Sequence, residues 1–147
     1  MKDFVETRLI SAIKNLLADR VNKLLEGLEF PIPLIEFGVY EGKSVVAPVV
    51  TLSACERTEK ERIIRLDAYS LTITFSFSEI PESELYCYAY SGAVSRALYD
   101  DPTLGGVADR AVVTGKKYIE SKLPYCGDGW KLVVFLRVTV GGIGSGE

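Results

Sequence analysis

The residues best suited to chemistry lie in one short stretch, Asp100 to Gly115, which reads DDPTLGGVADRAVVTG. Asp100, Asp101 and Asp109 could offer Mg²⁺ or Ca²⁺ the carboxylate oxygens that these ions prefer. However, adjacent aspartates point in different directions, and the spacing of an EF-hand is absent. The same residues also suit a turn, because aspartate bonds nearby amides, proline fixes φ and glycine reaches positive φ. A divalent-metal site therefore stays open, and a structural turn is the preferred interpretation.

A phosphate site is a second hypothesis for this stretch, because Gly115 precedes Lys116. A P-loop needs the pattern GxxxxGK[ST] between a strand and a helix, so that backbone amides and lysine meet the phosphates. Here Lys117 follows Lys116, and Arg110 stands where the first glycine belongs. The C-terminal GGIGSG also lacks GxGxxG spacing and has no helix after it. The sequence therefore predicts neither a nucleotide site nor a dinucleotide site.

Histidine and cysteine usage narrows the possible chemistry further. The chain has no histidine, which removes every catalytic triad or dyad with a histidine base. Cys55, Cys87 and Cys126 are odd in number and far apart, unlike a disulfide framework or a zinc motif. We expect them to be buried free thiols. Carboxylate or lysine chemistry stays open, although no spacing shows two acids converging in an apolar pocket.

Composition predicts an ordinary soluble domain. The 147 residues carry a net charge of −3, which does not favour a general nucleic-acid binder. No apolar run approaches the roughly 18–20 residues that span a bilayer, and the start lacks a signal-peptide core. We expect a single α+β domain over residues 1–140, a flexible glycine-rich tail over 141–147, and no membrane partner.

Hydrophobic spacing predicts a long helix from Lys2 to about Leu28, which the FPIP segment at Phe30–Pro33 ends. Its expected buried stripe comprises Ile10, Ile13, Leu17, Val21, Leu24 and Leu28, widened by Val5, Leu9, Leu16 and Leu25. A second helix is expected from Pro81 to about Tyr99. Its expected inner face comprises Leu85, Tyr88, Ala89, Ala93 and Ala97.

Four strands complete the predicted order α-β-β-α-β-β. They are a strand over Ser44–Ala54, the alternating YSLTITFSF at Tyr69–Phe77, a strand over Arg110–Lys122, and KLVVFLRVTV at Lys131–Val140. Pro48 suggests an edge position or a bulge. The charged Glu56–Arg62 segment suggests a solvated hairpin tip, and CGDGW suggests a tight turn. We therefore predict a two-layer domain with a four-stranded, mainly antiparallel sheet and two helices on one face. The Ser/Thr face of the second strand could meet another subunit.

These elements resemble the tail-terminator, or tail-completion, proteins of long-tailed bacteriophages and prophages. The resemblance covers Lys2 to Val140. It lies in a long first helix leading into FPIPLIEFG, the strand AYSLTITFSF, the helix and loop YAYSGAVSRALYDDPTLGG, and the strand opening VADRAVVTG. In that family a loop of the DPTLGG type, here Asp101 to Gly106, ends the second helix and leads into a strand.

The resemblance implies a structural virion protein, and therefore no enzyme, catalytic residue, cofactor or metal. Such proteins form a ring, commonly a hexamer, that caps the tail tube, ends its polymerisation and offers the head–tail joining surface. The implied partners are further copies of the chain, the tail-tube protein, the head–tail connector and DNA that passes without sequence-specific binding. The implied locations are the host bacterial cytoplasm during assembly and the virion tail. The residues we expect at contacts are Arg57, Glu59, Lys60 and Glu61 in the hairpin, and Asp101, Leu104 and Gly105 in the loop.

Two alternatives remain at this point. A tail-tube or head–tail connector protein would have a similar two-layer domain. A small α+β enzyme or ligand-binding domain would use Asp100, Asp101 and Asp109 with a divalent metal.

Overall fold

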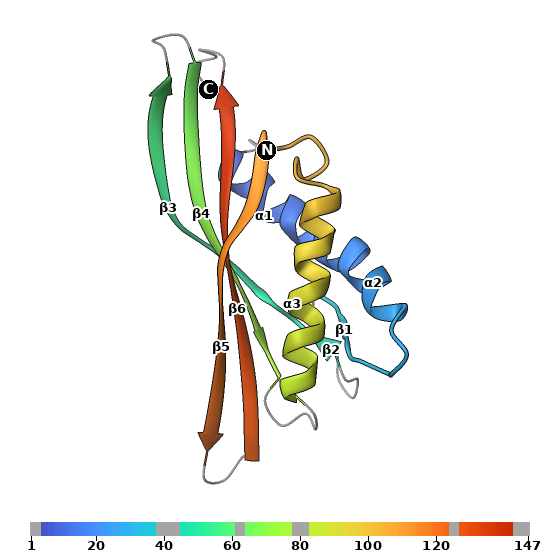
Figure 1. Cartoon of the computed structure of the whole chain (residues 1–147). Coiled ribbons are helices and arrows are strands. Elements are labelled where there is room, and N and C mark those ends of the chain that lie inside the picture. The colour runs from blue at the N-terminus through green and yellow to red at the C-terminus, as the bar shows by residue number, and fades with distance from the viewer. Residues whose placement is uncertain (1–3, 38–44, 61–63, 78–82, 124–126, 143–147) are drawn as a thin grey trace.

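The computed structural model describes residues 4–37, 45–60, 64–77, 83–123 and 127–142, which form two layers. One layer is an antiparallel sheet of four strands, and the other consists of helices that cover a single face of it (Figure 1). This arrangement confirms the predicted α+β class and the order α-β-β-α-β-β. The helices are α1 (Val5–Leu16), its continuation through Leu17–Val21 into α2 (Asn22–Glu26), and α3 (Ser83–Asp100). The strands of the sheet are β3 (Val49–Lys60), β4 (Ile64–Ser76), β5 (Arg110–Leu123) and β6 (Gly127–Gly142).

The first helix is continuous but contains a π-helical turn at Leu17–Val21, and this turn corrects the predicted buried face. A π turn holds more residues than an α turn, so the side chains that follow it rotate about the axis. As a result Leu25, which we predicted only to widen the stripe, is buried, whereas Leu24 and Leu28, which we predicted on its main face, are 37% and 38% exposed. The buried residues of the whole helix are Leu9, Ile13, Leu16, Leu17, Val21 and Leu25.

The sheet has the strand order β3-β4-β6-β5, so β3 and β5 are its two edges. Pro48 directly precedes β3, in agreement with the predicted edge position. The strands are longer than predicted: β3 continues to Lys60, and Gly127–Trp130 belongs to β6 rather than to a turn. Cross-strand pairing explains this, because Arg57 lies opposite Asp67 and Glu120 opposite Trp130. A short parallel ladder of β1 (Leu34–Ile35) and β2 (Val45–Val46) was not predicted, since two-residue strands carry no periodic signal.

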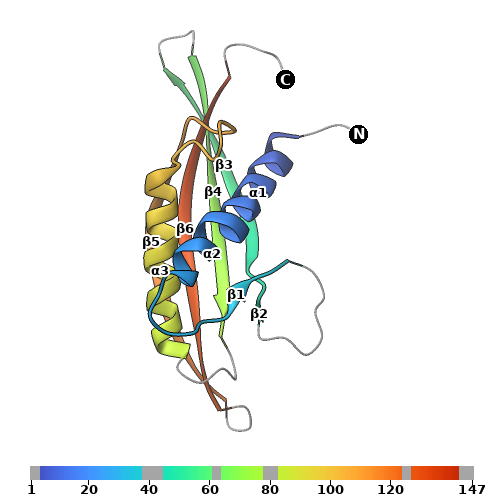
Figure 2. The same cartoon turned by 90° about the vertical axis from the view of Figure 1, so that its right-hand side faces the viewer.

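The sheet is staggered, and a hairpin projects beyond the helices at each end (Figures 1 and 2). At one end β3 and β4 continue to Lys60 and Ile64, beyond the point where β5 begins opposite Thr139. At the other end β5 and β6 continue to Leu123 and Gly127, beyond the end of β4 at Ser76. The predicted tip residues Glu61 and Arg62, the helix-start residue Pro81, Cys126 and the tail residues 143–147 lie outside the described residues. Gly141 and Gly142, which we predicted to begin the flexible tail, belong to β6 instead.

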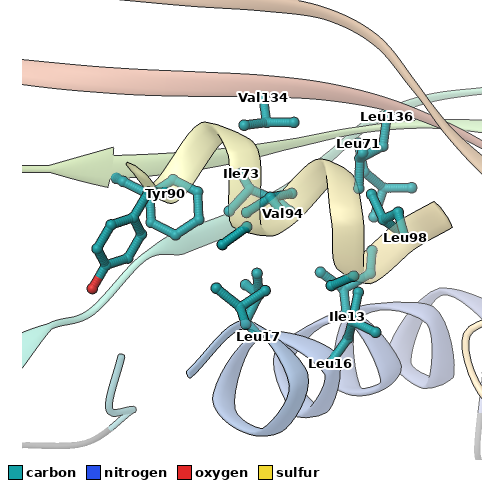
Figure 3. Packing of buried hydrophobic residues seen from close by; sticks show 14 of the residues in the cluster. Ile13, Leu16, Leu17, Leu71, Ile73, Tyr90, Val94, Leu98, Val134 and Leu136 are labelled. Carbon is teal, nitrogen blue, oxygen red and sulfur yellow. The ribbon is translucent and has the colours of Figure 1, made fainter. Parts of the chain in front are cut away.

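The core lies between the sheet and the helices (Figure 3). The alternation predicted for β4 is confirmed, because Leu71, Ile73, Phe75 and Phe77 are all buried. On β6 the buried residues are Leu132, Val134, Leu136 and Val138, also as predicted, and Val140 is half-buried. Both helices pack against these two central strands.

The inner face of α3 differs from the prediction. Leu85 and Tyr88 are 43% and 50% exposed, whereas Ala93 and Ala97 are buried as expected. The side chain that fixes this orientation is Tyr90, whose ring packs edge-on against Phe75 and Phe77, and whose hydroxyl donates to the Pro33 carbonyl. The helix is rich in small residues on several sides, so its pattern alone did not show which side faces the sheet. The remaining core residues of α3 include Cys87, Val94 and Leu98.

No described helix covers the other face of the sheet (Figure 1). Its centre bears the hydroxyl residues Ser70, Thr72 and Thr74, with Val133 and Phe135 beside them on β6. Charged residues at outward positions of this face, judged from the strand register, are Arg110, Lys117, Lys131, Arg137 and Glu56. The hydroxyl residues of β4 carry no charge, but Arg137 lies opposite Ser70, and the β5–β6 side of this face has an excess of basic residues.

Candidate assembly surface

The loop from Asp101 to Asp109 is held together by its own hydrogen bonds. The Asp101 carboxylate accepts from the backbone amide of Gly105 at 3.1 Å and from the Thr103 hydroxyl at 3.4 Å. The amides of Gly106 and Ala108 both donate to the Thr103 carbonyl at 3.0 Å. An anion-binding loop needs amides that point outward without partners. These amides are engaged inside the loop, so its geometry is that of a structural turn.

Backbone conformation explains the choice of residues in this turn. Leu104, Gly105 and Gly106 have φ values of 52°, 71° and 94°. Such values are rare for residues with a side chain, and glycine adopts them without steric cost. Leu104 tolerates its position because its side chain is 4% exposed and packs into the core. The loop is thus fixed at its centre by a buried leucine.

Two further hydrogen bonds attach the loop to the sheet. The amide of Ala111 donates to the Pro102 carbonyl at 2.7 Å, and the amide of Asp109 donates to the Thr139 carbonyl at 2.9 Å. The first closes the loop at its base, and the second joins it to the neighbouring strand β6. The stretch that resembled a ligand site is therefore a fixed connection between α3 and β5.

The three aspartates of the loop point to different neighbours. Asp100 pairs with Arg96 along α3 at 3.2 Å, whereas Asp101 faces Arg20 of the first helix at 3.8 Å. Asp109 packs over Gly141 of β6, where a Cβ atom would overlap its carboxylate. Within the described residues, no three His, Cys, Asp or Glu side chains gather as a metal site would require. The metal hypothesis for these residues thus gains no support from their positions.

A hollow of about 540 Å³ lies between α1 and the loop. Asp101, Leu104 and Gly105, the loop residues predicted to make contacts, all line it. The opposite wall is the polar side of the first helix, including Arg8, Asn15, Asp19 and Arg20. The structure thus brings the loop together with α1, and its two arginines and two aspartates give the hollow a balanced charge.

A second hollow of about 460 Å³ separates α1 from the β3–β4 hairpin. Arg57 lines it together with Asp67, and their side chains form an ion pair at 3.3 Å. Tyr69 also lines it, and burial, followed by the neighbouring Cys55, raises the pKa of this tyrosine to about 12. Arg8 lines both hollows, so the hairpin and the loop flank the same part of α1.

The structure describes only some of the hairpin residues that we predicted to make contacts. Arg57, Glu59 and Lys60 belong to β3 rather than to a solvated tip, and Glu61 lies outside the described residues. In the backbone register Glu59 lies opposite Arg65, so the strand continues through the charged segment. Cys55, which we expected to be buried, is exposed on the same strand, because it lies at the sheet edge.

Arg8 and Arg20 were not predicted as surface residues of interest. The only available signal was the polar side of the first helix, where bases and acids alternate as on any solvated helix. Their importance depends on the loop, which lies more than 80 positions further along the chain. Sequence spacing does not report such a distant contact.

Comparison with known proteins does not assign a family. No protein-family model matches the chain, and no curated protein matches it. Among the described residues, no helix is long and apolar enough to cross a membrane.

Proposed function

We propose that this protein is a structural subunit of a bacteriophage or prophage tail. In this proposal, copies form a ring, commonly a hexamer, that caps the tail tube, ends its polymerisation and joins it to the head connector. The observation that carries the proposal is the loop from Asp101 to Asp109, which is a hydrogen-bonded joint between α3 and β5. This is the role that a DPTLGG loop has in the tail-terminator proteins that the sequence resembles.

The surfaces of the chain support self-assembly and docking. The helices cover only one face of the sheet (Figure 1), and the open face has a row of hydroxyl residues along β4. A hairpin projects from each end of the sheet, well placed to reach a neighbouring chain. A ring requires head-to-tail contacts between different surfaces of each copy. The open face, the hairpins and the hollow beside Asp101 offer such different surfaces.

Charge bears on how DNA would pass through the ring. A channel for sliding DNA is best served by a surface without an excess of positive charge, because basic residues hold phosphates. The net charge of −3 agrees with that requirement. The open face has four basic residues and one acidic residue among its described outward positions. We therefore propose that this face is turned toward a protein neighbour, not toward the DNA.

Deleting the gene from the phage or prophage that encodes the chain tests this function directly. A tail terminator predicts tails that grow beyond the normal length and stay separate from heads, visible by electron microscopy. Loss of all tails would instead indicate a tail-tube protein, and unattached tails of normal length would indicate a connector. Normal virions after deletion would contradict every role in the tail. Restoring the intact gene on a plasmid provides the control.

A further inference from the structure

The open face of the sheet carries exposed basic residues that have no acidic partner. They are Arg110, Lys117, Lys131 and Arg137, and the strand register places all four on the side away from the helices. No ion pair joins any of them to a carboxylate of the described residues. The ion pairs of those residues use other bases, namely Arg20, Lys23, Arg57 and Arg96. The open face therefore has positive charge that an acidic partner can neutralise.

The same face has a hollow beside two β-bulges. The bulge of β3 follows Leu52 and that of β5 follows Val113, and these two residues belong to one cross-strand row with Leu71 and Leu136. Bulges bend a strand and increase its twist. A hollow of about 490 Å³ lies at this row, and its lining residues include Ser53, Thr114, Phe135 and Arg137. The open face is therefore shaped to receive a projecting group.

Most of the side chains around the hollow are held in place. The hydroxyl of Ser53 donates to the Ser70 carbonyl at 3.0 Å, and the hydroxyl of Thr114 donates to the Phe135 carbonyl at 3.3 Å. The Lys117 ammonium group lies 5.9 Å from the centre of the Phe135 ring. Arg137 is exposed, and a guanidinium group binds carboxylates with paired hydrogen bonds. The hollow thus suits a carboxylate that arrives together with apolar side chains.

The helical layer offers such a group where its first helix ends. Residues 24–42 contain four glutamates and no lysine or arginine. Two of these, Glu26 and Glu29, are exposed at the end of α2, and Leu24 and Leu28 beside them are partly exposed. This end of the helix is directed away from the sheet (Figure 1). We call it the α2 end, and it comprises Leu24, Glu26, Leu28 and Glu29.

The negative charge of the α2 end is not neutralised nearby. Backbone carbonyls give the C-terminal end of a helix a partial negative charge, so basic side chains are favoured there. The base in the last turn is Lys23, and it pairs with Asp19 at 3.3 Å. Glu26 and Glu29 form no ion pair with any base that the structure describes. The α2 end therefore attracts cations from outside its own chain.

We propose that the open sheet face of one copy receives the α2 end of a second copy. Glu26 and Glu29 then face Arg137 and the other unpaired bases, and the two leucines cover the apolar part of the hollow. The two surfaces belong to opposite layers of the domain (Figure 1), so the contact is head to tail and closes into a ring when the rotation allows. This inference rests on the proposed ring function, to which it adds the identity of the lateral contact.

A nucleic acid fits the open face less well than a second copy does. The net charge of −3 opposes the approach of a phosphate chain. The face also bears the exposed side chains of Val49 and Ile119, which the register places on the same side as Arg137. Apolar side chains of a protein partner can cover these residues, whereas phosphates cannot. The observations therefore favour the α2 end as the occupant.

Charge reversal on each surface tests the contact with the full chain. Arg137→Glu brings like charges together at the contact, and so does Glu29→Arg on the other surface. In each variant the half-assembly concentration from sedimentation should rise about tenfold or more. Both residues are exposed, so the fold should be retained, as a far-ultraviolet circular dichroism melt can verify. Arg96→Glu is the matched control, because it makes the same change on an exposed position of α3 and should leave assembly unchanged.

An equal mixture of the two variants gives the decisive measurement. When Arg137→Glu and Glu29→Arg chains alternate, every contact again joins an acid to a base. The mixture should therefore assemble near the concentration that the natural chain requires, whereas assembly lost through misfolding would not return. Failure of the mixture to assemble would overturn the proposal.

The remaining outcomes separate the contact from the ring function. If either variant assembles alone as well as the natural chain does, the proposed contact is wrong but the ring function stands. If Arg137→Glu keeps its oligomer and loses affinity for a labelled DNA duplex, the open face binds DNA and the proposal is wrong. A natural chain that stays monomeric would contradict both the contact and the ring.

Discussion

The Asp101 carboxylate accepts a hydrogen bond from the backbone amide of Gly105, with 3.1 Å between Oδ1 and N. This contact closes the turn that follows α3, while Asp100 beside it points along the helix to Arg96. Two adjacent acids thus have different surroundings. A pair that could have held a metal is divided between a loop and a helix surface.

Asp101→Ala should destabilise the protein by about 1 kcal/mol, because the amide of Gly105 and the hydroxyl of Thr103 lose their acceptor. Asp100→Ala should change the free energy of unfolding by less than about 0.5 kcal/mol, since its ion pair with Arg96 is exposed. Urea unfolding of the two neighbouring variants measures the difference. Equal effects would show that Asp101 has no special role in the loop.

Leu25→Ala should cost about 2–5 kcal/mol of unfolding free energy, as expected for a buried leucine that leaves a cavity. Leu24→Ala should cost less than about 1 kcal/mol, because Leu24 is partly exposed. The two residues are adjacent, so the comparison tests the rotation caused by the π turn. The reverse order of effects, which a regular α-helix predicts, would contradict the π turn.

Stability should fall at alkaline pH, in part because of Cys87. Burial, with a smaller effect of Glu84, raises the pKa of its thiol from the ordinary value near 9 to about 11. Between these values the unfolded chain loses the thiol proton while the folded chain keeps it, so rising pH favours unfolding. Unfolding free energies measured from pH 8 to pH 10 should therefore decline.

A Cys87 variant separates this contribution from that of the tyrosines. Cys87→Ala should flatten the decline between pH 9 and pH 10, because the buried thiol with the raised pKa is then absent. The slopes are compared rather than the absolute values, since removing a buried side chain lowers stability at every pH. An unchanged slope in Cys87→Ala would mean that the thiol does not contribute.

Much of the sheet could be predicted because strand side chains repeat every two residues. The alternation of Leu71, Ile73 and Phe75 with hydroxyl residues appears directly in the sequence and in the buried face of β4. The order of elements followed from similar patterns and from the proline and glycine positions. The loop after α3 could also be interpreted as a turn, since each of its residue types has a local reason to be there.

Other features depend on distant contacts and could not be predicted. Tyr90 orients α3 through Phe75, Phe77 and the Pro33 carbonyl, which belong to three other segments. The π turn in the first helix changes which leucine is buried without any clear local signature. The hollow beside Asp101 forms only when α1 meets a loop that lies far along the chain. Local spacing does not determine any of these relationships.

The most direct test of the central claim is the mass of the assembled species, measured for the purified full chain by native mass spectrometry over a range of concentrations. We expect one closed oligomer with a fixed subunit number, commonly six in rings of this kind, formed cooperatively from monomers. A broad series of open-ended polymers would favour a tube protein. A chain that stays monomeric at every concentration would contradict the account.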